Sequence, residues 1–298
     1  MRARPAPMDL SHVRFRAPRP PRPAVRPARY LASPHTSQDA GFADCVDGLP
    51  AIVLARAGLD AGAYRAAPLR RRVAACLRAV SASSETAALA QLEQDDTLHS
   101  TALNTLLIGV SSFFRDADVF TALQTRVVPT LAARPGTLRV ISLGCSFGAE
   151  VYSLAMLLAE AGLLARAEVV GLDCRADAIT AARSGLVDER TLAGLPPELR
   201  TRYLERTATG WRLTDTLRAR ITWAVDDITQ RVAEGPWDLV LCRNVLMYLR
   251  SDVAATLCRR IVAALAVGGV VVLGKAERPA ASFRLRTLAH CVHQFDGH

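Results

Sequence analysis

A glycine turn followed by a carboxylate is the segment of this chain best suited to binding a ligand. Gly144 and Gly148 follow the apolar run 138–143, and Glu150 comes two residues later. Strand, glycine turn and helix in this order bring backbone N–H groups and a helix N-terminus close to a ligand. The spacing is not G-x-G-x-x-G, and Glu150 would repel a pyrophosphate. A carboxylate there suits a cationic ligand, such as the amino group and sulfonium of S-adenosylmethionine.

Two further acids stand at the ends of apolar runs. Isolated glycine pairs are often mere tight turns, so these neighbours have to support the interpretation. Asp173 ends the run 168–173, where an acid can accept hydrogen bonds from both ribose hydroxyls of an adenosine. Asp227 follows the run 220–225 and could accept from the exocyclic amine of adenine. Each acid could instead cap a helix.

Polar side chains also follow the apolar run 237–242. Arg243 and Asn244 come directly after it, and Tyr248 follows one helical turn later, on the same side as Asn244. Upstream, Arg115 could bind a carboxylate through both ends of its guanidinium. An ordinary ion pair with a neighbouring aspartate, Asp116 or Asp118, is the alternative for that arginine.

Alternating strands and helices position these groups. We predict strands at 138–143, 168–173, 220–225, 237–242 and 268–274, and helices at 149–161, 175–184 and 251–266. Such alternation predicts an α/β fold with a mostly parallel sheet and helices on both faces. The segment 186–219 breaks this rhythm. Within it, 195–199 could be a loop or a helix start, and 210–213 could belong to a small hairpin.

The chain is helical in pattern from about Cys45 to Leu123. Amphipathic pieces are expected at 49–59, 69–80, 87–92 and 98–107. The second piece carries three consecutive arginines, Arg70, Arg71 and Arg72. They could form a solvated helix face or a docking surface for an acidic protein helix.

The net charge of +9 is concentrated near the N-terminus. Residues 1–30 hold eight arginines and one acid, which leaves +2 for the remainder, so nucleic acid is not an expected partner. Seven scattered cysteines without a C-x-x-C pattern argue against disulfides or a metal site. No apolar run is long enough to span a membrane. We therefore expect a cytoplasmic protein that is not inserted in a membrane.

Together these segments resemble the chemotaxis receptor methyltransferases, the CheR family. The family shows F-F-R-[DE], G-C-S-T-G-E-E-P-Y-S-L-A, an acidic strand end, F-D-x-I-x-C-R-N-V-x-I-Y-F and L-G-x-S-E, in this order. The corresponding segments here are 113–116, 144–155, Asp173, 237–248 and 273–277. The similarity extends from about residue 45 to residue 280, and several motifs in matching order make it specific.

The resemblance implies a cofactor, S-adenosyl-L-methionine, a product, S-adenosyl-L-homocysteine, and no metal. The residues implied to surround the cofactor are Ser111, Arg115, Gly144, Glu150, Asp173, Asp227, Ile228, Cys242 and Arg243. Arg115, Asn244 and Tyr248 would line the methyl-transfer site. The helix with Arg70, Arg71 and Arg72 would dock the receptor.

The implied function is methylation of glutamate side-chain carboxylates of chemoreceptors or related signalling proteins by a monomeric protein-glutamate O-methyltransferase. The implied architecture is a Rossmann-like S-adenosylmethionine-dependent methyltransferase domain at 124–298, with a short insertion at about 186–219. A small helical docking domain at 41–123 and a disordered Arg/Pro-rich tail at 1–40 would precede it. The insertion is shorter than the one that grips a receptor's C-terminal peptide in some members, so we expect no such tether.

The chain departs from the family pattern at several positions. Gly109 and Asp227 stand where members have Asn, and Phe147, Ala149 and Val151 replace the usual residues around the glycine turn. Phe147 is bulky enough to crowd the methionine end of the cofactor and impair turnover. Two alternatives therefore stay open. One is a weakened member that binds the cofactor or its product and signals without catalysis. The other, which the near-neutral folded part disfavours, is methylation of a small molecule or nucleic acid.

Overall fold

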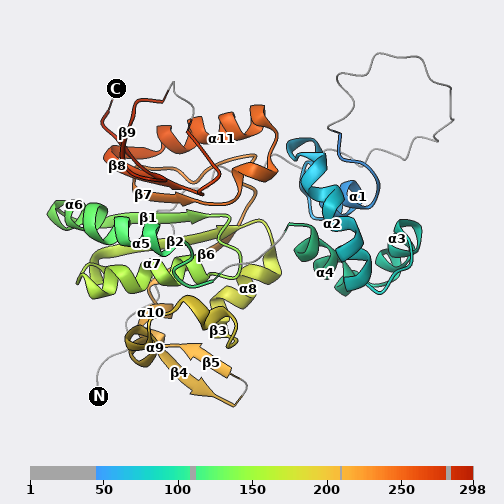
Figure 1. Cartoon of the computed structure of the whole chain (residues 1–298), viewed down its shortest axis with the longest axis horizontal. Helices are drawn as coiled ribbons and strands as arrows, with labels where there is room; N and C mark the ends of the chain where they lie inside the picture. Colours follow the sequence, from blue (N-terminus) through green and yellow to red (C-terminus); the bar gives the residue numbers. More distant parts are fainter. Residues whose placement is uncertain (1–44, 108–111, 209, 280–282, 298) are drawn as a thin grey trace.

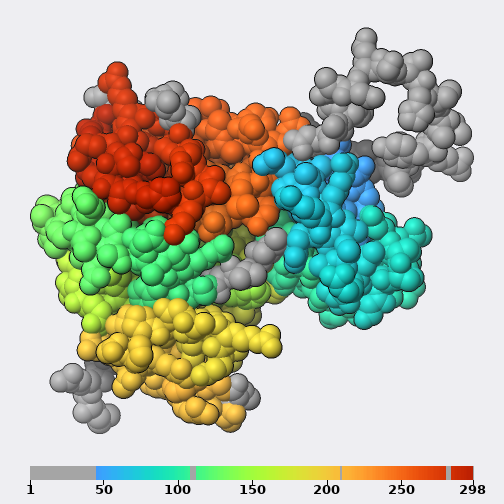
Figure 2. Space-filling model, viewed as in Figure 1, coloured from blue at the N-terminus to red at the C-terminus, as the bar shows by residue number. Residues whose placement is uncertain are grey.

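The computed structural model describes residues 45–107, 112–208, 210–279 and 283–297. In this part of the chain a helical region lies beside a larger region built on a sheet, and a small second sheet projects from the larger region (Figures 1 and 2). No helix in these ranges combines the length and the apolar character that a membrane span requires.

The N-terminal helical region contains four helices, as predicted. They are α1 (Gly48–Arg56), α2 (Ala66–Ala79), α3 (Glu85–Gln94) and α4 (Asp96–Leu106), with the short η1 (Ala61–Ala63) after α1. Side chains cap the N-termini of α3 and α4. The Ser84 hydroxyl accepts from the N–H of Ala87 at the start of α3, and the Asp95 carboxylate accepts from the N–H of Thr97 at the start of α4.

The larger region contains a sheet of seven strands in the order β6-β2-β1-β7-β8-β10-β9. The strands are β1 (Leu138–Leu143), β2 (Ala167–Asp173), β6 (Ile221–Val225), β7 (Trp237–Cys242), β8 (Leu265–Leu273), β9 (Leu285–Ala289) and β10 (Val292–Phe295). The first five in this order pair in parallel, and β10 and β9 add on antiparallel. The predicted mostly parallel, Rossmann-like sheet is therefore confirmed. The strand order reverses between β1 and β7, the place where such sheets bind ligands beyond the carboxyl ends of their strands.

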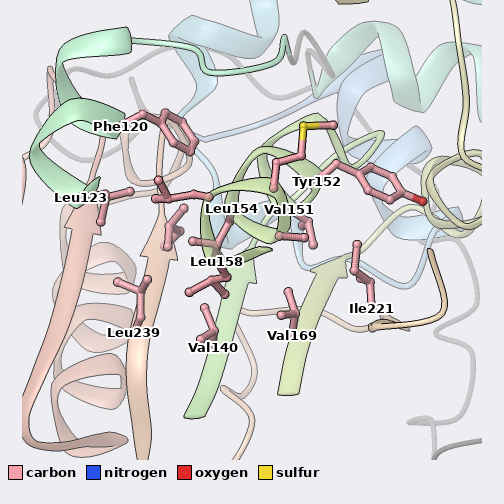
Figure 3. Close-up of a cluster of buried hydrophobic side chains, with 14 of the residues drawn as sticks. Phe120, Leu123, Val140, Val151, Tyr152, Leu154, Leu158, Val169, Ile221 and Leu239 are labelled. Carbon is pink, nitrogen blue, oxygen red and sulfur yellow. The ribbon is translucent and has the colours of Figure 1, made fainter. Parts of the chain in front are cut away.

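Helices cover both faces of this sheet. The helical segments of the larger region outside the second sheet are α5 (Ala117–Ala122), η2 (Leu123–Val127), α6 (Val128–Ala133), α7 (Ala149–Glu160), η3 (Leu164–Arg166), α8 (Ala176–Ser184), α10 (Asp215–Arg218), η5 (Leu246–Tyr248) and α11 (Ser251–Ala263). On one face, Val151, Leu154 and Leu158 of α7 point toward Val140 and Leu239 of the sheet (Figure 3).

On the other face, Leu257 of α11 packs in a buried cluster that also contains Ile141 of β1 and Leu49 of α1. This second cluster continues into the helical region, which therefore shares a hydrophobic core with the sheet.

A second sheet occupies the segment where the predicted rhythm breaks. Its strands β3 (Leu186–Val187), β4 (Leu204–Thr207) and β5 (Gly210–Leu213) pair antiparallel in the order β3-β5-β4, with η4 (Thr191–Gly194) and α9 (Pro197–Tyr203) between β3 and β4. The predicted hairpin was incomplete, because β3 is only two residues long and carries no alternating pattern. The expectation that no receptor peptide is tethered here stays a prediction.

Candidate functional site

A cavity opens at the carboxyl ends of the parallel strands. Its lining includes nine of the residues predicted for the site: Arg115, Gly144, Glu150, Asp173, Asp227, Ile228, Arg243, Asn244 and Tyr248. Gly109 and Ser111 lie outside the described residues. Cys242 is fully buried in the cluster on the α11 face of the sheet and does not line the cavity. Its side chain points away because successive strand residues face opposite sides.

The glycine turn needs its two glycines. Gly144 has φ +70°, and a Cβ there would lie 2.6 Å from the side chain of Val245; Gly148 has φ +85°, and a Cβ there would lie 2.6 Å from Trp223. Phe147, between them, is 41% exposed and does not line the cavity. Its ring centroid lies 5.5 Å from the guanidinium carbon of Arg175. The turn directs this side chain outward, so the cavity lining gives no support to the prediction that Phe147 crowds the cofactor.

Asp173 is buried at the end of β2, with 4% of its surface exposed. Its carboxylate accepts from the N–H of Ser146 at 2.8 Å and from the N–H and Nε of Arg175, each at 3.0 Å. The helix-cap alternative does not describe this arrangement, because the residue at the N-cap of α8 is Arg175.

Asp227 lies in a turn after β6, and no helix begins there. Its carboxylate accepts from the N–H and from the hydroxyl of Thr229, both at 2.8 Å. Burial raises the pKa of Asp227 above the ordinary aspartate value, although the bonds from Thr229 oppose the shift. The Asp227 carboxylate is therefore a hydrogen-bond acceptor, and its burial disfavours the ionised form.

Glu150 and Arg243 form an ion pair on the wall of the cavity. Arg243 Nη1 donates to Glu150 Oε2 over 2.9 Å, and Ser142 Oγ donates to the other carboxylate oxygen over 2.8 Å. Arg243 Nη2 donates to Asp116 Oδ2 over 2.6 Å. Lys275 Nζ lies 2.8 Å from Asp118 and 3.7 Å from Asp116. The aspartates that were alternative partners for Arg115 are therefore paired with other cations.

A second cavity adjoins the first. Its lining consists of Arg115, Asp116, Asn244, Met247, Tyr248, Lys275 and Ala276. Arg115, Asn244 and Tyr248 line both cavities. These three residues are the ones that the sequence predicts for the methyl-transfer site, and that role stays a prediction.

A buried carboxylate holds the loop that carries Asn244. Glu277 is 4% exposed and accepts from the N–H groups of Gly274 at 2.7 Å, Asn244 at 3.0 Å and Met247 at 3.3 Å. Asn244 has φ +60°, a left-handed conformation that such bonds help to stabilise. Glu277 belongs to the L-G-x-S-E-like segment, and its contacts give that motif a structural role.

Tyr64 of the helical region also lines the first cavity, and sequence reasoning missed it. It is 7% exposed, and burial, followed by the nearby Cys174 and Asp227, raises the pKa of its phenol well above the usual value. Its backbone pairs antiparallel with Leu249. On either side, the N–H of Arg65 donates to Tyr248 O over 2.8 Å and the N–H of Arg250 donates to Ala63 O over 3.0 Å.

Comparison with known proteins identifies the family. Residues 109–288 match the model of the CheR methyltransferase, SAM binding domain. The chain belongs to the CheR methyltransferase family. It is 34% identical over 176 residues to "Chemotaxis protein methyltransferase 1" of Pseudomonas aeruginosa, covering 55% of this chain and 64% of that relative. It is 31% identical over 222 residues to "Putative methyltransferase Cher3" of Pseudomonas putida, covering 72% of this chain and 81% of the relative.

Among solved structures, the N-methyltransferase NodS from Bradyrhizobium japonicum, in complex with S-adenosyl-L-homocysteine, is 20% identical with a TM-score of 0.33, covering 55% of this chain and 62% of that one. This likeness is too small to add to the family assignment. The matched SAM binding domain contains the whole strand edge around the first cavity, from Gly144 to Tyr248. The cofactor of this CheR-family chain is therefore S-adenosylmethionine.

The residues of the first cavity fit that cofactor. Its methionine end carries one ammonium and one carboxylate group, and Glu150 and Arg243 offer one charge of each sign side by side. Its sulfonium adds a positive charge. The lining also includes Asp227, whose carboxylate is a hydrogen-bond acceptor, Asp173, whose carboxylate already accepts from Ser146 and Arg175, and Ile228, which contributes apolar surface. Among the described residues no group of three or more His, Cys, Asp or Glu side chains could hold a metal ion.

The three arginines predicted to dock a receptor differ in their surroundings. Arg70 lies 3.3 Å from Asp47 and donates to Cys45 O over 3.2 Å. Arg72 is partly buried, and its Nε donates to Thr105 O of α4 over 3.0 Å. Arg71 is exposed on α2. Of the three, Arg71 is thus the most available to a partner.

Proposed function

We propose that the protein transfers the methyl group of S-adenosylmethionine to glutamate side-chain carboxylates of a chemoreceptor cytoplasmic domain or a related signalling protein. The observation that carries the proposal is the meeting of two cavities at Arg115, Asn244 and Tyr248. An in-line displacement needs its nucleophile and its leaving group on opposite sides of the transferred carbon. Two cavities that meet at shared polar residues provide such an arrangement.

When bound in the first cavity, S-adenosylmethionine supplies an electrophilic methyl group on a positive sulfur. A glutamate carboxylate is already ionised at neutral pH, so no protein base has to remove a proton. One of its oxygens forms the new bond to the methyl carbon as the carbon–sulfur bond breaks, and the electron pair stays on sulfur. The products are a methyl ester and S-adenosylhomocysteine. The protein contributes by aligning the two reactants. In favourable intramolecular reactions such alignment lowers the activation free energy by up to about 7–11 kcal/mol.

The second cavity has the chemistry to align a carboxylate. Arg115 presents a guanidinium, which binds carboxylates through two parallel hydrogen bonds, and Tyr248 adds a hydroxyl. Lys275 also lines this cavity, and its charge is balanced by Asp118 and Asp116. Asn244 lies between the two cavities on a loop that Glu277 holds. We assign Arg115 and Tyr248 to orienting the acceptor and Asn244 to lining the point of transfer.

The choice of acceptor rests on the family and on α2. The relative from Pseudomonas aeruginosa is named as a chemotaxis protein methyltransferase. This chain spans 64% of that relative's length, so its substrate is carried over as part of the proposal. Arg71 offers a positive charge to an acidic helix, as receptor docking would require.

The binding-only alternative loses its main support. It rested on Phe147, Ala149 and Val151, and none of these side chains lines either cavity. Ala149 and Val151 are buried in α7, 3% and 0% exposed, where they pack in the core.

The decisive experiment is transfer of labelled methyl from S-adenosylmethionine to receptor cytoplasmic fragments co-expressed with this protein. Label that stays on the receptor after gel separation and leaves as methanol in base would establish a carboxyl methyl ester. Binding of S-adenosylhomocysteine without any transfer would favour the signalling module. Label on small molecules alone, or label stable in base, would contradict the proposed acceptor.

A further inference from the structure

The carboxylate of Asp173 is already fully hydrogen-bonded by the protein itself. Oδ1 accepts from the N–H and the Nε of Arg175, each at 3.0 Å, and a longer contact from Cys174 Sγ at 3.9 Å. Oδ2 accepts from the N–H of Ser146 at 2.8 Å and from Nη2 of Arg175 at 3.3 Å. A carboxylate offers about four acceptor positions in all. No position is left for the ribose hydroxyls that an acid at this place in the fold would bind.

Arg175 supplies three of these bonds and is itself held in place. It is 4% exposed, and its Nη1 donates to Asn104 Oδ1 of α4 over 3.1 Å. Asn104 in turn donates to Asp177 in the first turn of α8. Both Asp173 and Arg175 line the cofactor cavity, so the guanidinium competes for the same carboxylate in the same space as the ligand.

We infer that Arg175 competes with the ribose of the cofactor for Asp173 and thereby lowers the affinity of this site. The inference depends on the cofactor assignment and not on the identity of the acceptor. A ribose diol can bind Asp173 only when the guanidinium gives up at least one oxygen. The apparent dissociation constant is then the intrinsic one divided by the fraction of molecules in which Arg175 has moved aside.

The guanidinium also contacts an aromatic ring while it is bonded to Asp173. The ring of Phe147 lies 5.5 Å from its carbon atom and is 41% exposed, so this ring borders solvent. An arginine that leaves Asp173 can stay over this aromatic face, where cations are attracted to the ring. Phe147 and Arg175 would then act together, and the bulky residue in the glycine turn has a use that does not involve the methionine end.

The test is calorimetric binding of S-adenosylhomocysteine to the full chain and its variants. For Arg175→Ala we expect a dissociation constant about three- to tenfold lower than that of the wild type, which corresponds to release of a competitor that is engaged in roughly 70–90% of molecules. The opposite direction, weaker binding, is expected if Arg175 contacts the cofactor or merely supports the fold. The sign of the change therefore distinguishes competition from support.

Two further variants make the test decisive. Arg175→Lys keeps the charge that balances Asp173 and so guards against misfolding, but an ammonium cannot make the same parallel bonds; we expect an intermediate affinity. Arg183→Ala changes another arginine of α8 that does not line the cavity, and should bind like the wild type. An unchanged or higher dissociation constant in both Arg175 variants would overturn the inference. Binding by none of the proteins, wild type included, would overturn it together with the cofactor assignment.

Discussion

Arg243 Nη1 lies 2.9 Å from Glu150 Oε2, and this bond joins the end of β7 to the first turn of α7. The arginine side chain is 1% exposed and also pairs with Asp116 at 2.6 Å. One buried cation therefore balances two carboxylates that come from different segments. Through these two pairs the guanidinium links the cofactor cavity to the segment 113–116.

Arg243→Met should be strongly destabilising. The change leaves two partly buried carboxylates without their cation, and breaking a buried pair by removing one partner costs about 3–5 kcal/mol. The measurement is the free energy of unfolding in urea. Arg126→Met, an exposed arginine of η2, serves as the control and should change stability little. A loss below about 1 kcal/mol in Arg243→Met would show that solvent already screens this pair.

Arg115→Ala should reduce turnover by about 100-fold while leaving the fold nearly intact. The side chain is exposed at the junction of the two cavities, so its loss affects alignment of the acceptor more than the core. Arg115→Lys should restore only part of the rate, since a lysine lacks the paired donors. Turnover like that of the wild type in the alanine variant would remove Arg115 from the transfer site.

Tyr64→Phe should weaken binding of S-adenosylhomocysteine by about three- to tenfold, the loss expected for one neutral hydrogen bond. The phenol lies in the cavity wall, and a tyrosine hydroxyl can donate a hydrogen bond at neutral pH. Tyr203→Phe is the matched control, because the Tyr203 hydroxyl donates to Glu160 away from the cavity. Equal affinity of the wild type and Tyr64→Phe would mean that the hydroxyl does not reach the ligand.

The sequence predicts the sheet better than it predicts the completed site. Strong apolar runs in the sequence locate the five parallel strands. Because parallel strands have their carboxyl ends at the same edge of the sheet, this topology brings Asp173, Asp227 and Arg243 to that edge. The antiparallel strands β9 and β10 were missed because they are short and lack a strong apolar pattern.

The missed site residues have a different cause. Tyr64 reaches the cavity only because its segment pairs with Leu249, far along the chain, when the helical region docks on the sheet. No local pattern signals that contact. Arg175 follows Asp173 by two residues, but its side chain turns back onto that acid through a bond network that includes Asn104. Cys242 differs from the other motif residues because its side chain faces the opposite side of the sheet, as alternation along a strand requires.

Asp227→Asn should stabilise the protein at neutral and higher pH. Burial raises the pKa of Asp227 in the folded state above its unfolded value, so the ionised carboxylate opposes folding. That penalty is fully present above the folded pKa and disappears as the pH falls toward the unfolded value. The melting temperature of the variant should therefore exceed that of the wild type at pH 8, and the difference should shrink toward pH 4. A gap that grows on acidification would contradict this sign.

Arg71→Glu should raise the KM for a receptor fragment by about three- to tenfold and leave the affinity for S-adenosylhomocysteine unchanged. Arg71 is exposed on α2, whereas Arg72 donates to Thr105 O and Arg70 pairs with Asp47. Charge reversal at an exposed position repels an acidic partner, and the effect should weaken at high salt as the charges are screened. Arg72→Ala provides the contrast, because losing its bond to α4 should lower the free energy of unfolding more than it alters KM. If Arg71→Glu leaves the KM unchanged at low salt, α2 is a solvated face and receptors dock elsewhere.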